Sequence, residues 1–202
     1  MSERIIEFFW DIVSPYTYLA STQIDRVGRE CGVPVWWRPF LLGGVFRETG
    51  NRPPAEVPAK GAYMLDDLKN WASYYRVTFR FPESFPTNSL MPMRAAVFAD
   101  RSGKGHEFAL AMMQAYWCEG RDPSLLETVQ GMAQSVGLDG ERTIQMTQDQ
   151  DIKEELRRNT EEAVRRGAFG APTFFVGKKM FCGNDRLGML ELYLKGELPV
   201  ES

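Results

Sequence analysis

Residues 4–16 read Arg-Ile-Ile-Glu-Phe-Phe-Trp-Asp-Ile-Val-Ser-Pro-Tyr, and this stretch decides the fold. The apolar, β-rich run over residues 4–10 predicts a strand that is buried on both faces. Ser14 and Pro15 then mark a helix start, because serine is a favoured N-cap and proline fits the first helical position. The apolar spacing that follows predicts one helix continuing to Glu30.

A second strand and a long loop are predicted next. Gly32 ends the helix, and residues 33–39 have the composition of a strand. A strand, a helix and a second strand with a short return form a βαβ unit, so the two strands are expected to be parallel. Residues 41–60 are rich in glycine and proline and predict a long ordered loop, a kind of segment that often carries function in compact domains.

The middle of the chain is predicted to be helical. The expected helices cover residues 63–75, 91–100, 107–117, 124–136 and 149–166. The aromatic, proline-containing loop at residues 79–88 either plugs the core beneath it or lines a site, and the pattern leaves both open.

The end of the chain returns to strands. Residues 171–176 and 179–182 predict two strands joined by a turn at residues 177–178. The last helix is expected to open at residues 183–186, with Asn184 or Asp185 as its cap, and to run to Leu194.

Composition narrows the classes of function. The chain has 202 residues, enough for a sizeable core, and a net charge of −3 gives no reason to expect nucleic acid or an anionic membrane as partner. No apolar run approaches the roughly 20 residues that span a bilayer, and no signal peptide is recognisable, so a cytoplasmic location is expected. The three cysteines form no C-x-x-C pair, which favours free thiols over disulfides or a metal site. The one histidine, His106, is expected to be solvated, which leaves no obvious general base.

Several segments together resemble 2-hydroxychromene-2-carboxylate isomerases, bacterial relatives of the kappa-class glutathione transferases. They are residues 11–20, residues 42–46, Lys60 with Tyr63 and Asp67, residues 169–174 and residues 183–187. The resemblance extends over nearly the whole chain. It implies an α/β, thioredoxin-like βαβ–ββα domain of the DsbA type with a large all-α insertion. Residues 1–60 and 168–202 would form the glutathione-binding domain and residues 61–167 the inserted helical domain.

The resemblance also implies a glutathione site and a substrate site, with no metal. Ser14 corresponds to the residue that contacts the glutathione sulfur, and Ala171, before a cis-proline, to the one that pairs with the cysteinyl backbone. The residues that hold the glutamyl and glycyl ends of the tripeptide in the family correspond to Asn51, Lys60, Asn184 and Asp185. Cys182 and Gly183 lie in the same segment as the last two. The hydrophobic substrate would lie near Phe46, Phe85 and Asn88.

Serine at a helix start is most often only a cap, so the proposed chemistry needs physical support. Ser14 follows a buried strand, at the edge of the sheet where open α/β folds bind ligands, and a helix N-terminus favours an anion. Lowering a thiol pKa by about two units takes about 2.7 kcal/mol. A helix dipole supplies roughly 0.3–1 kcal/mol, and a hydrogen bond to a charged sulfur roughly 1.5–3 kcal/mol. Ser14 is therefore expected to act as a hydrogen-bond donor, while glutathione supplies the nucleophile.

The resemblance implies a glutathione-dependent cis–trans isomerase that converts 2-hydroxychromene-2-carboxylate into trans-o-hydroxybenzylidenepyruvate, a step in aromatic catabolism. The route would be reversible addition of the thiolate to the substrate, and the relatives are homodimers. A kappa-class glutathione S-transferase that acts on small electrophiles uses the same first site and stays open. A non-catalytic peptide-binding thioredoxin-like module is a third reading. A disulfide oxidoreductase has the least support because the C-x-x-C pair is absent.

Overall fold

The computed structural model describes residues 4–198. The predicted glutathione-binding domain begins at residue 1 and ends at residue 202, and both of these limits lie outside the described residues. Its single sheet has four strands in the order β2-β1-β3-β4. The strands are β1 (Ile6–Trp10), β2 (Val35–Pro39), β3 (Thr173–Val176) and β4 (Lys179–Cys182). β1 is parallel to β2 and antiparallel to β3, and β4 is antiparallel to β3, which confirms the βαβ unit and the C-terminal hairpin.

Strand β1 is buried on both faces, as its sequence predicts. Phe8 and Trp10 lie on one face in the large core cluster, while Phe9 lies on the other face in a smaller cluster. Phe9 packs edge-on against Phe40 and Phe175, with ring centroids 5.7 and 5.6 Å away. The continuous apolar run is therefore needed because no side of β1 faces water.

The predicted helix after Ser14 is instead two helices, α1 (Pro15–Ser21) and α2 (Ile24–Cys31). The hydroxyl of Ser21 donates to the Tyr18 carbonyl at 2.6 Å, and that of Thr22 donates to the Leu19 carbonyl at 2.7 Å. Short polar side chains that bond the backbone in this way compete with the helical ladder, and the chain turns here. The helix that begins at Ser14 is consequently only seven residues long.

The prediction of a loop over residues 41–60 is wrong. This segment holds the helix α3 (Leu42–Thr49), the short 3-10 helix η1 (Pro54–Glu56) and the start of α4 (Pro58–Tyr75). α3 forms because Leu42 and Val45, one turn apart, are both buried. Gly44 permits a close approach to a later helix, since a Cβ there would lie 3.0 Å from Cγ2 of Thr160.

The other helices largely agree with the prediction, except that neither Asn184 nor Asp185 caps the last helix, because both lie in a short 3-10 turn and Arg186 is the N-cap of that helix. They are α5 (Leu90–Arg101), α6 (Gly105–Trp117), α7 (Leu126–Ser135), α9 (Gln150–Arg165), η2 (Asn184–Arg186) and α10 (Leu187–Lys195). The helix α8 (Gly140–Met146) was not predicted, although Asp139 caps it by accepting from the Arg142 N–H at 2.9 Å. Every helix in the described part of the chain is too short or too polar to span a bilayer.

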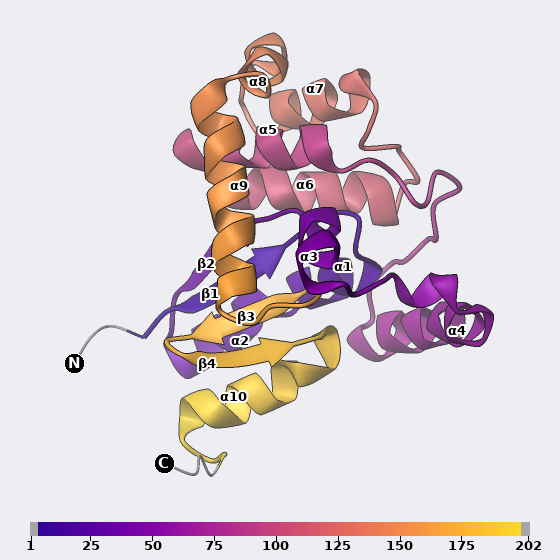
Figure 1. Cartoon of the computed structure of the whole chain (residues 1–202), viewed down its shortest axis with the longest axis vertical. Coiled ribbons are helices and arrows are strands. Elements are labelled where there is room, and N and C mark those ends of the chain that lie inside the picture. Colours follow the sequence, from indigo (N-terminus) through magenta and orange to yellow (C-terminus); the bar gives the residue numbers. More distant parts are fainter. Residues whose placement is uncertain (1–3, 199–202) are drawn as a thin grey trace.

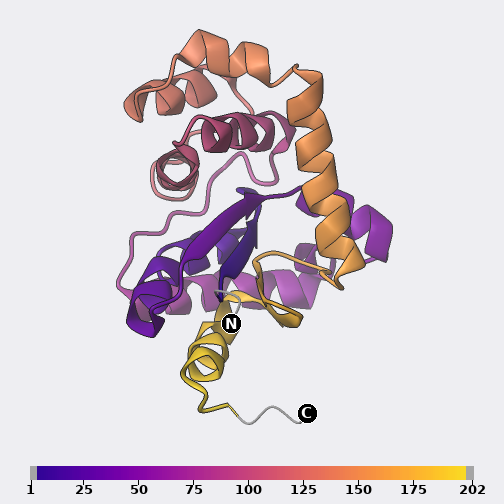
Figure 2. The same ribbon diagram turned by 90° about the vertical axis from the view of Figure 1, so that its left-hand side faces the viewer.

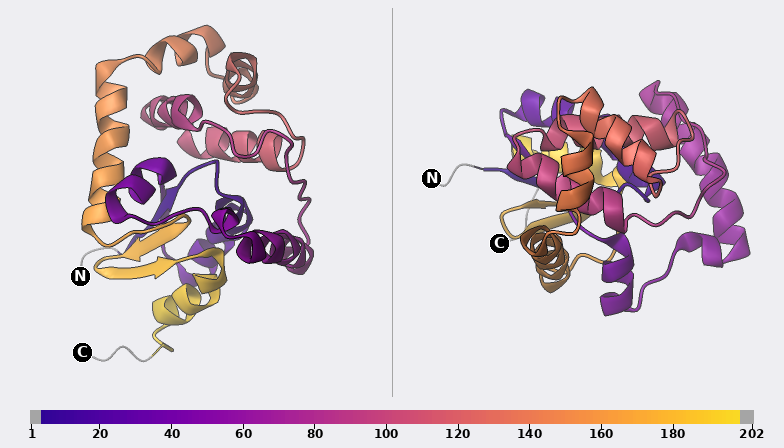
Figure 3. Two further views of the ribbon diagram at one scale, coloured as in Figure 1. Left: turned by 45° about the vertical axis from the view of Figure 1, so that its right-hand side comes forward. Right: turned by 90° about the horizontal axis from the view of Figure 1, so that it is seen from above.

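The helices between β2 and β3 form an inserted helical region. Figure 1 shows α5–α8 gathered at one end of the molecule and α10 at the other, with α9 returning from the helical end to the sheet. Figure 2 shows the same stacking from the side. Figure 3 shows α4 standing apart from α9, and α4 contacts α1. Because η2 also contacts α1, the start of the first helix is flanked by the two elements that hold the candidate ligand-binding residues.

Candidate functional site

Ser14 lies at the carboxyl end of β1 and is the N-cap of α1, as predicted. Its Oγ accepts a hydrogen bond from the Thr17 N–H at 3.2 Å and donates one to the Ala171 carbonyl at 3.0 Å. Only 4% of Ser14 is exposed. The peptide bond between Ala171 and Pro172 is cis. The structure thus brings together Ser14 and Ala171, which lie 157 residues apart in the sequence.

This contact defines what Ser14 can do chemically. A serine hydroxyl has a single proton to donate, and here it is directed at the Ala171 carbonyl. Rotation about Cβ–Oγ would direct the proton to another acceptor and leave the Ala171 carbonyl open to another donor. Ser14 and Ala171 are therefore a donor–acceptor pair that a ligand with an anionic atom and a nearby N–H could replace.

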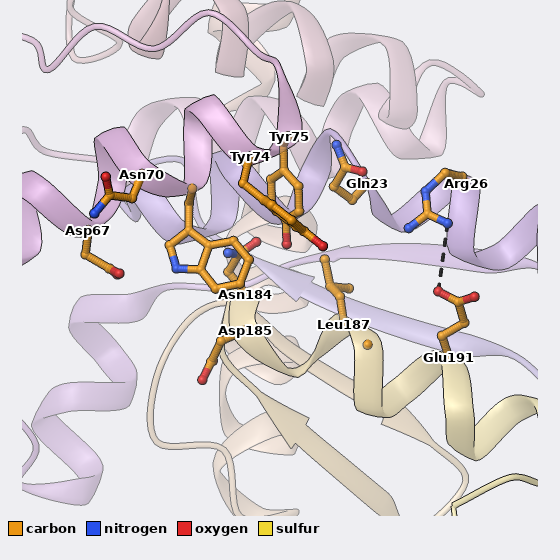
Figure 4. A pocket seen from close by; sticks show the side chains of 12 residues that line it. Gln23, Arg26, Asp67, Asn70, Tyr74, Tyr75, Asn184, Asp185, Leu187 and Glu191 are labelled. Atoms are coloured by element: carbon orange, nitrogen blue, oxygen red, sulfur yellow. Dashed lines mark ion pairs between the residues drawn. The ribbon is translucent and has the colours of Figure 1, made fainter.

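A cavity of about 480 Å³ lies between α4, the start of α2 and the start of α10 (Figure 4), and one of its lining residues, Asp67, bonds Tyr16 of α1. In Figure 4, Tyr74 and Tyr75 stand on one side of it, and Asn184, Leu187 and Glu191 on the other. Asn184 is 1% exposed, and its side-chain amide makes no well-formed hydrogen bond among the described residues, although the Tyr75 hydroxyl lies close enough to interact with it. A buried amide without well-formed hydrogen bonds is costly, so a polar ligand in the cavity would satisfy it.

The cavity wall combines aromatic and acidic side chains with one cation, Arg26, which pairs with Glu191 at 3.8 Å. Asp67 accepts a hydrogen bond from the hydroxyl of Tyr16 at 2.8 Å, which ties α4 to α1. Burial, together with this carboxylate, raises the pKa of Tyr16, and burial raises the pKa of Tyr75 to about 12. Asp185 is half-exposed and lies 3.5 Å from Arg186. Carboxylates beside a buried amide and aromatic rings suit the ammonium end of an amino acid.

Asn51 and Lys60 are arranged differently. Asn51 follows α3, and its Nδ2 donates to the Phe169 carbonyl at 2.8 Å, close to Ala171 in the chain. Lys60 is exposed in the first turn of α4, and it forms no ion pair within residues 4–198. Asn51 is thus held against the segment before the cis-proline, while Lys60 projects a cation from the neighbouring helix.

Cys182 and Gly183 support the site from β4. The hydroxyl of Thr173 donates to Cys182 Sγ at 3.5 Å, and burial raises the pKa of this thiol, so at neutral pH it is not a thiolate. Gly183 has a φ of 109°, and a Cβ there would lie 2.5 Å from Oδ1 of Asp185. Glycine is therefore required for the turn that directs Asn184 and Asp185.

The three predicted substrate residues lie on two segments. Phe46 is half-buried on α3. Phe85 packs against Phe81 and Trp117 with ring centroids 4.9 and 6.1 Å away, and part of its ring stays accessible. Asn88 is exposed and accepts from the Leu90 N–H at 2.9 Å, at the start of α5. The loop aromatics Phe79, Phe81 and Phe85 therefore pack against the core, and all three are partly buried.

One buried residue joins these segments and was missed at the level of sequence. Asp11 is fully buried, and burial, opposed by its hydrogen bonds, raises its pKa to about 6. Its carboxylate accepts from the backbone of Val13 and Leu42 and from the hydroxyl of Ser89. An acidic residue directly after a buried strand and before Ser-Pro was the available signal.

His106 lies in another part of the molecule. It contacts Asp25, with Nε2 and Oδ2 2.7 Å apart, and packs edge-on against Trp37. With no polar contact from His106 to Ser14 among residues 4–198, a histidine base at Ser14 has no support.

Comparison with known proteins gives the family. The DSBA-like thioredoxin domain matches residues 5–195. The chain is 34% identical to a 2-hydroxychromene-2-carboxylate isomerase of Sphingobium xenophagum, covering 95% of this chain and 98% of that protein. It is 28% identical to glutathione S-transferase kappa 1 of Homo sapiens, covering 96% of this chain and 92% of that protein.

A solved structure gives the same result at the level of the fold. A 2-hydroxychromene-2-carboxylate isomerase superposes with a TM-score of 0.86 and 26% identity, covering 95% of each chain. The shared features are the mixed four-stranded sheet and the inserted helical region. The chain therefore belongs to the DSBA-like thioredoxin domain family and is related within it to 2-hydroxychromene-2-carboxylate isomerases and kappa-class glutathione transferases.

Proposed function

We propose that this protein is a glutathione-dependent isomerase that converts 2-hydroxychromene-2-carboxylate into trans-o-hydroxybenzylidenepyruvate. The observation that carries the proposal is the contact of Ser14 Oγ with the Ala171 carbonyl at the start of α1, a helix that also contacts η2, which carries the buried Asn184 amide of the cavity wall. The relatives that bear the name of this isomerase are similar over almost their full length.

The residues present fit glutathione. Ser14 would hold the sulfur, and the Ala171 backbone would pair with the cysteinyl unit. Asn184 has both a donor and an acceptor to offer the α-amino acid end, and Asp185 would attract its ammonium group. Asn51 and Lys60 would receive the glycyl carboxylate, with Lys60 as its counter-ion.

The hydrogen bond from Ser14 contributes more than the helix dipole. The dipole acts mainly through the first turn of a helix, and α1, with seven residues, supplies roughly 0.3–1 kcal/mol. The hydroxyl must then supply most of the about 2.7 kcal/mol that a thiol pKa lowered by about two units requires. With one charge-assisted hydrogen bond of roughly 1.5–3 kcal/mol, the two contributions sum to about 1.8–4 kcal/mol, a range that includes the required value.

When bound, glutathione supplies a thiolate for reversible addition to the ring-opened, unsaturated acid, which permits rotation about the former double bond. Ser14 would keep that sulfur ionised by turning its hydroxyl proton away from the Ala171 carbonyl. The carbonyl would accept the cysteinyl N–H in exchange, so neither polar group loses a partner. Phe46 and Phe85 would hold the aromatic ring close to the sulfur, where proximity accounts for much of the rate.

A kappa-class transferase is the second candidate, favoured by the 28% identity to the human kappa enzyme over 96% of this chain. It shares the first site and differs in releasing a conjugate. A peptide-binding module accounts less well for the buried Asn184 amide, which suits a small polar ligand. A homodimer and a cytosolic location belong to the proposal, and the three free cysteines are consistent with that location.

Product analysis separates these candidates. Purified protein is incubated with 2-hydroxychromene-2-carboxylate, with and without glutathione, and the acid is followed by absorbance and mass spectrometry. An isomerase gives trans-o-hydroxybenzylidenepyruvate only with glutathione and leaves the glutathione concentration unchanged. A stable adduct that consumes glutathione would identify a transferase instead. Absence of either product would exclude both enzymes.

A further inference from the structure

We propose that Asp11 is a positioning residue that fixes the sulfur-binding turn relative to the two segments that would carry the electrophilic acceptor. This inference rests on the proposed function, because it assigns Asp11 a role in joining the two halves of that site. Asp11 touches neither glutathione nor acceptor in this proposal and acts through the backbone and hydroxyl groups that it holds.

The first link is to the turn that carries Ser14. Oδ1 of Asp11 accepts from the Val13 N–H at 3.1 Å. The backbone carbonyl of Asp11 accepts from the Ser14 N–H at 3.2 Å. Both bonds fix the backbone that aims the Ser14 hydroxyl, so the position of the sulfur site depends directly on Asp11.

The second and third links reach the acceptor side. Oδ2 of Asp11 accepts from the Leu42 N–H at 2.8 Å and from the Ser89 hydroxyl at 3.0 Å. Leu42 begins α3, and Phe46 lies one turn later on the same helix. Ser89 directly follows Asn88 at the start of α5. A single carboxylate oxygen therefore joins both predicted acceptor segments.

The chemistry of the site requires a carboxylate. Glu7, the other largely buried acid on this strand, is compensated by Arg38 and Arg166, whereas no cation bonds Asp11 within residues 4–198. An uncompensated buried carboxyl is costly, so it calls for a function. Ionised Asp11 only accepts, on two oxygens, and three donors converge on it. An asparagine would place an NH₂ group against at least one of them.

The bonds of Asp11 predict which property of the enzyme changes when they are lost. Catalysis between two bound groups is sensitive to small displacements, and a shift of about 1 Å can cost about 100-fold in rate. Glutathione would keep Lys60, Asn184 and Asp185, none of which depends on a bond to Asp11, whereas Ser14 and Asn51 would be loosened with the turn and with α3. Loosening α3 and α5 should therefore affect use of the acceptor far more than binding of glutathione.

The test compares Asp11→Asn and Ser89→Ala with a matched control, Asp100→Asn. Like Asp11, Asp100 has a carboxyl whose pKa is raised by burial. It lies near the C-terminal end of α5, whereas Ser89 lies at the start of that helix. Glutathione affinity is measured by titration calorimetry. The kcat and KM for the chromene acid are measured at saturating glutathione, and circular dichroism checks the fold.

We expect glutathione affinity to stay within about threefold in all three variants. We expect kcat/KM for the acid to fall about 10–100-fold in Asp11→Asn, by a smaller factor in Ser89→Ala, and not at all in Asp100→Asn. Ser89→Ala keeps two of the three donors and remains informative if Asp11→Asn does not fold.

Equal losses of glutathione affinity and acceptor use, or unchanged kinetics in a folded Asp11→Asn or Ser89→Ala protein, would overturn the assignment of Asp11. Failure of the proposed function has a different signature. In that case the wild-type protein itself shows no glutathione-dependent turnover of the acid, and the role of Asp11 falls with it.

Discussion

Replacing Ser14 by alanine tests the sulfur site most sharply. The structure gives the hydroxyl two partners, the Thr17 N–H at 3.2 Å and the Ala171 carbonyl at 3.0 Å. Both are lost in Ser14→Ala, while the backbone of α1 and the cis-proline segment stay in place. The variant therefore changes the stability of the fold and the stability of a bound thiolate by different amounts.

The two effects can be worked out separately. Loss of the N-cap costs about 1 kcal/mol, and loss of the bond to the Ala171 carbonyl costs roughly 0.5–1.5 kcal/mol more. The free energy of unfolding should then fall by about 2 kcal/mol. A bound thiolate loses roughly 1.5–3 kcal/mol of hydrogen bonding, which raises its pKa by about one to two units at 1.36 kcal/mol per unit.

The assay follows the ultraviolet absorbance of the thiolate at saturating glutathione as the pH is raised. Ser21→Ala is the matched control, because Ser21 is an equally buried serine of α1 whose hydroxyl donates to a backbone carbonyl away from the cavity. Ser14→Ala should raise the thiol pKa and lower turnover at pH 7 about 10–100-fold, while Ser21→Ala should change only stability. A thiol pKa that is the same in Ser14→Ala and wild type would refute the role of the hydroxyl.

Three further predictions concern the cavity, the turn beside it and the buried acids. Asn184→Ala should weaken glutathione binding about 10-fold or more in calorimetry, since one buried polar partner is worth roughly 1–3 kcal/mol; unchanged affinity would remove the amide from the site. Gly183→Ala should also weaken binding, with Asp185 displaced in a crystal structure, because a Cβ would lie 2.5 Å from its Oδ1; an undisturbed Asp185 would contradict this. Burial raises the pKa of Asp11 from 3.8 to about 6, so the native protein keeps a proton that the unfolded chain has lost, and stability should fall as the pH rises through 6, by at most about 3 kcal/mol. Urea unfolding at pH 5 and pH 7.5 should show about 1.4 kcal/mol of this fall in the wild type and none of it in Asp11→Asn, because the rest is lost below pH 5; an equal pH dependence in both proteins would exclude Asp11 as its source.

The parts of the fold with strong local signals could be predicted from the sequence. The apolar run before Asp11, the Ser14–Pro15 cap and the C-terminal hairpin are set by patterns within a few residues, and the structure agrees with them. The resemblance to a known family assigned Ser14 and Ala171 to one ligand, but their direct hydrogen bond was not predicted. The division into residues 1–60 with 168–202 and residues 61–167 stays a prediction.

The errors arose where tertiary contacts override local preference. Gly43 and Gly44 read as loop residues, yet α3 needs a small residue at position 44 because Thr160 of α9 lies against it. The break after Ser21 comes from hydroxyl-to-backbone hydrogen bonds that compete with the backbone hydrogen bonds of the helix. No glycine or proline at residues 21–23 indicates this break in the sequence.

Some residues of the candidate site could not be predicted for the same reason, because their roles depend on tertiary contacts. Asp11 was given no role in the sequence analysis, because its partners Leu42 and Ser89 lie 31 and 78 residues away. The cavity wall contributed by Trp71, Tyr74 and Tyr75 could not be predicted either, since it depends on how α4 packs beside α10. Side chains that converge from distant segments leave no periodic pattern in the sequence.

Glutathione uptake by the wild-type protein, followed through thiolate absorbance across a pH titration, tests the central claim most directly. The account predicts saturable binding at millimolar or lower concentrations, with a thiol pKa about two units below that of free glutathione. Protein that takes up no glutathione at millimolar levels, or that binds it with an unshifted thiol pKa, would contradict the account.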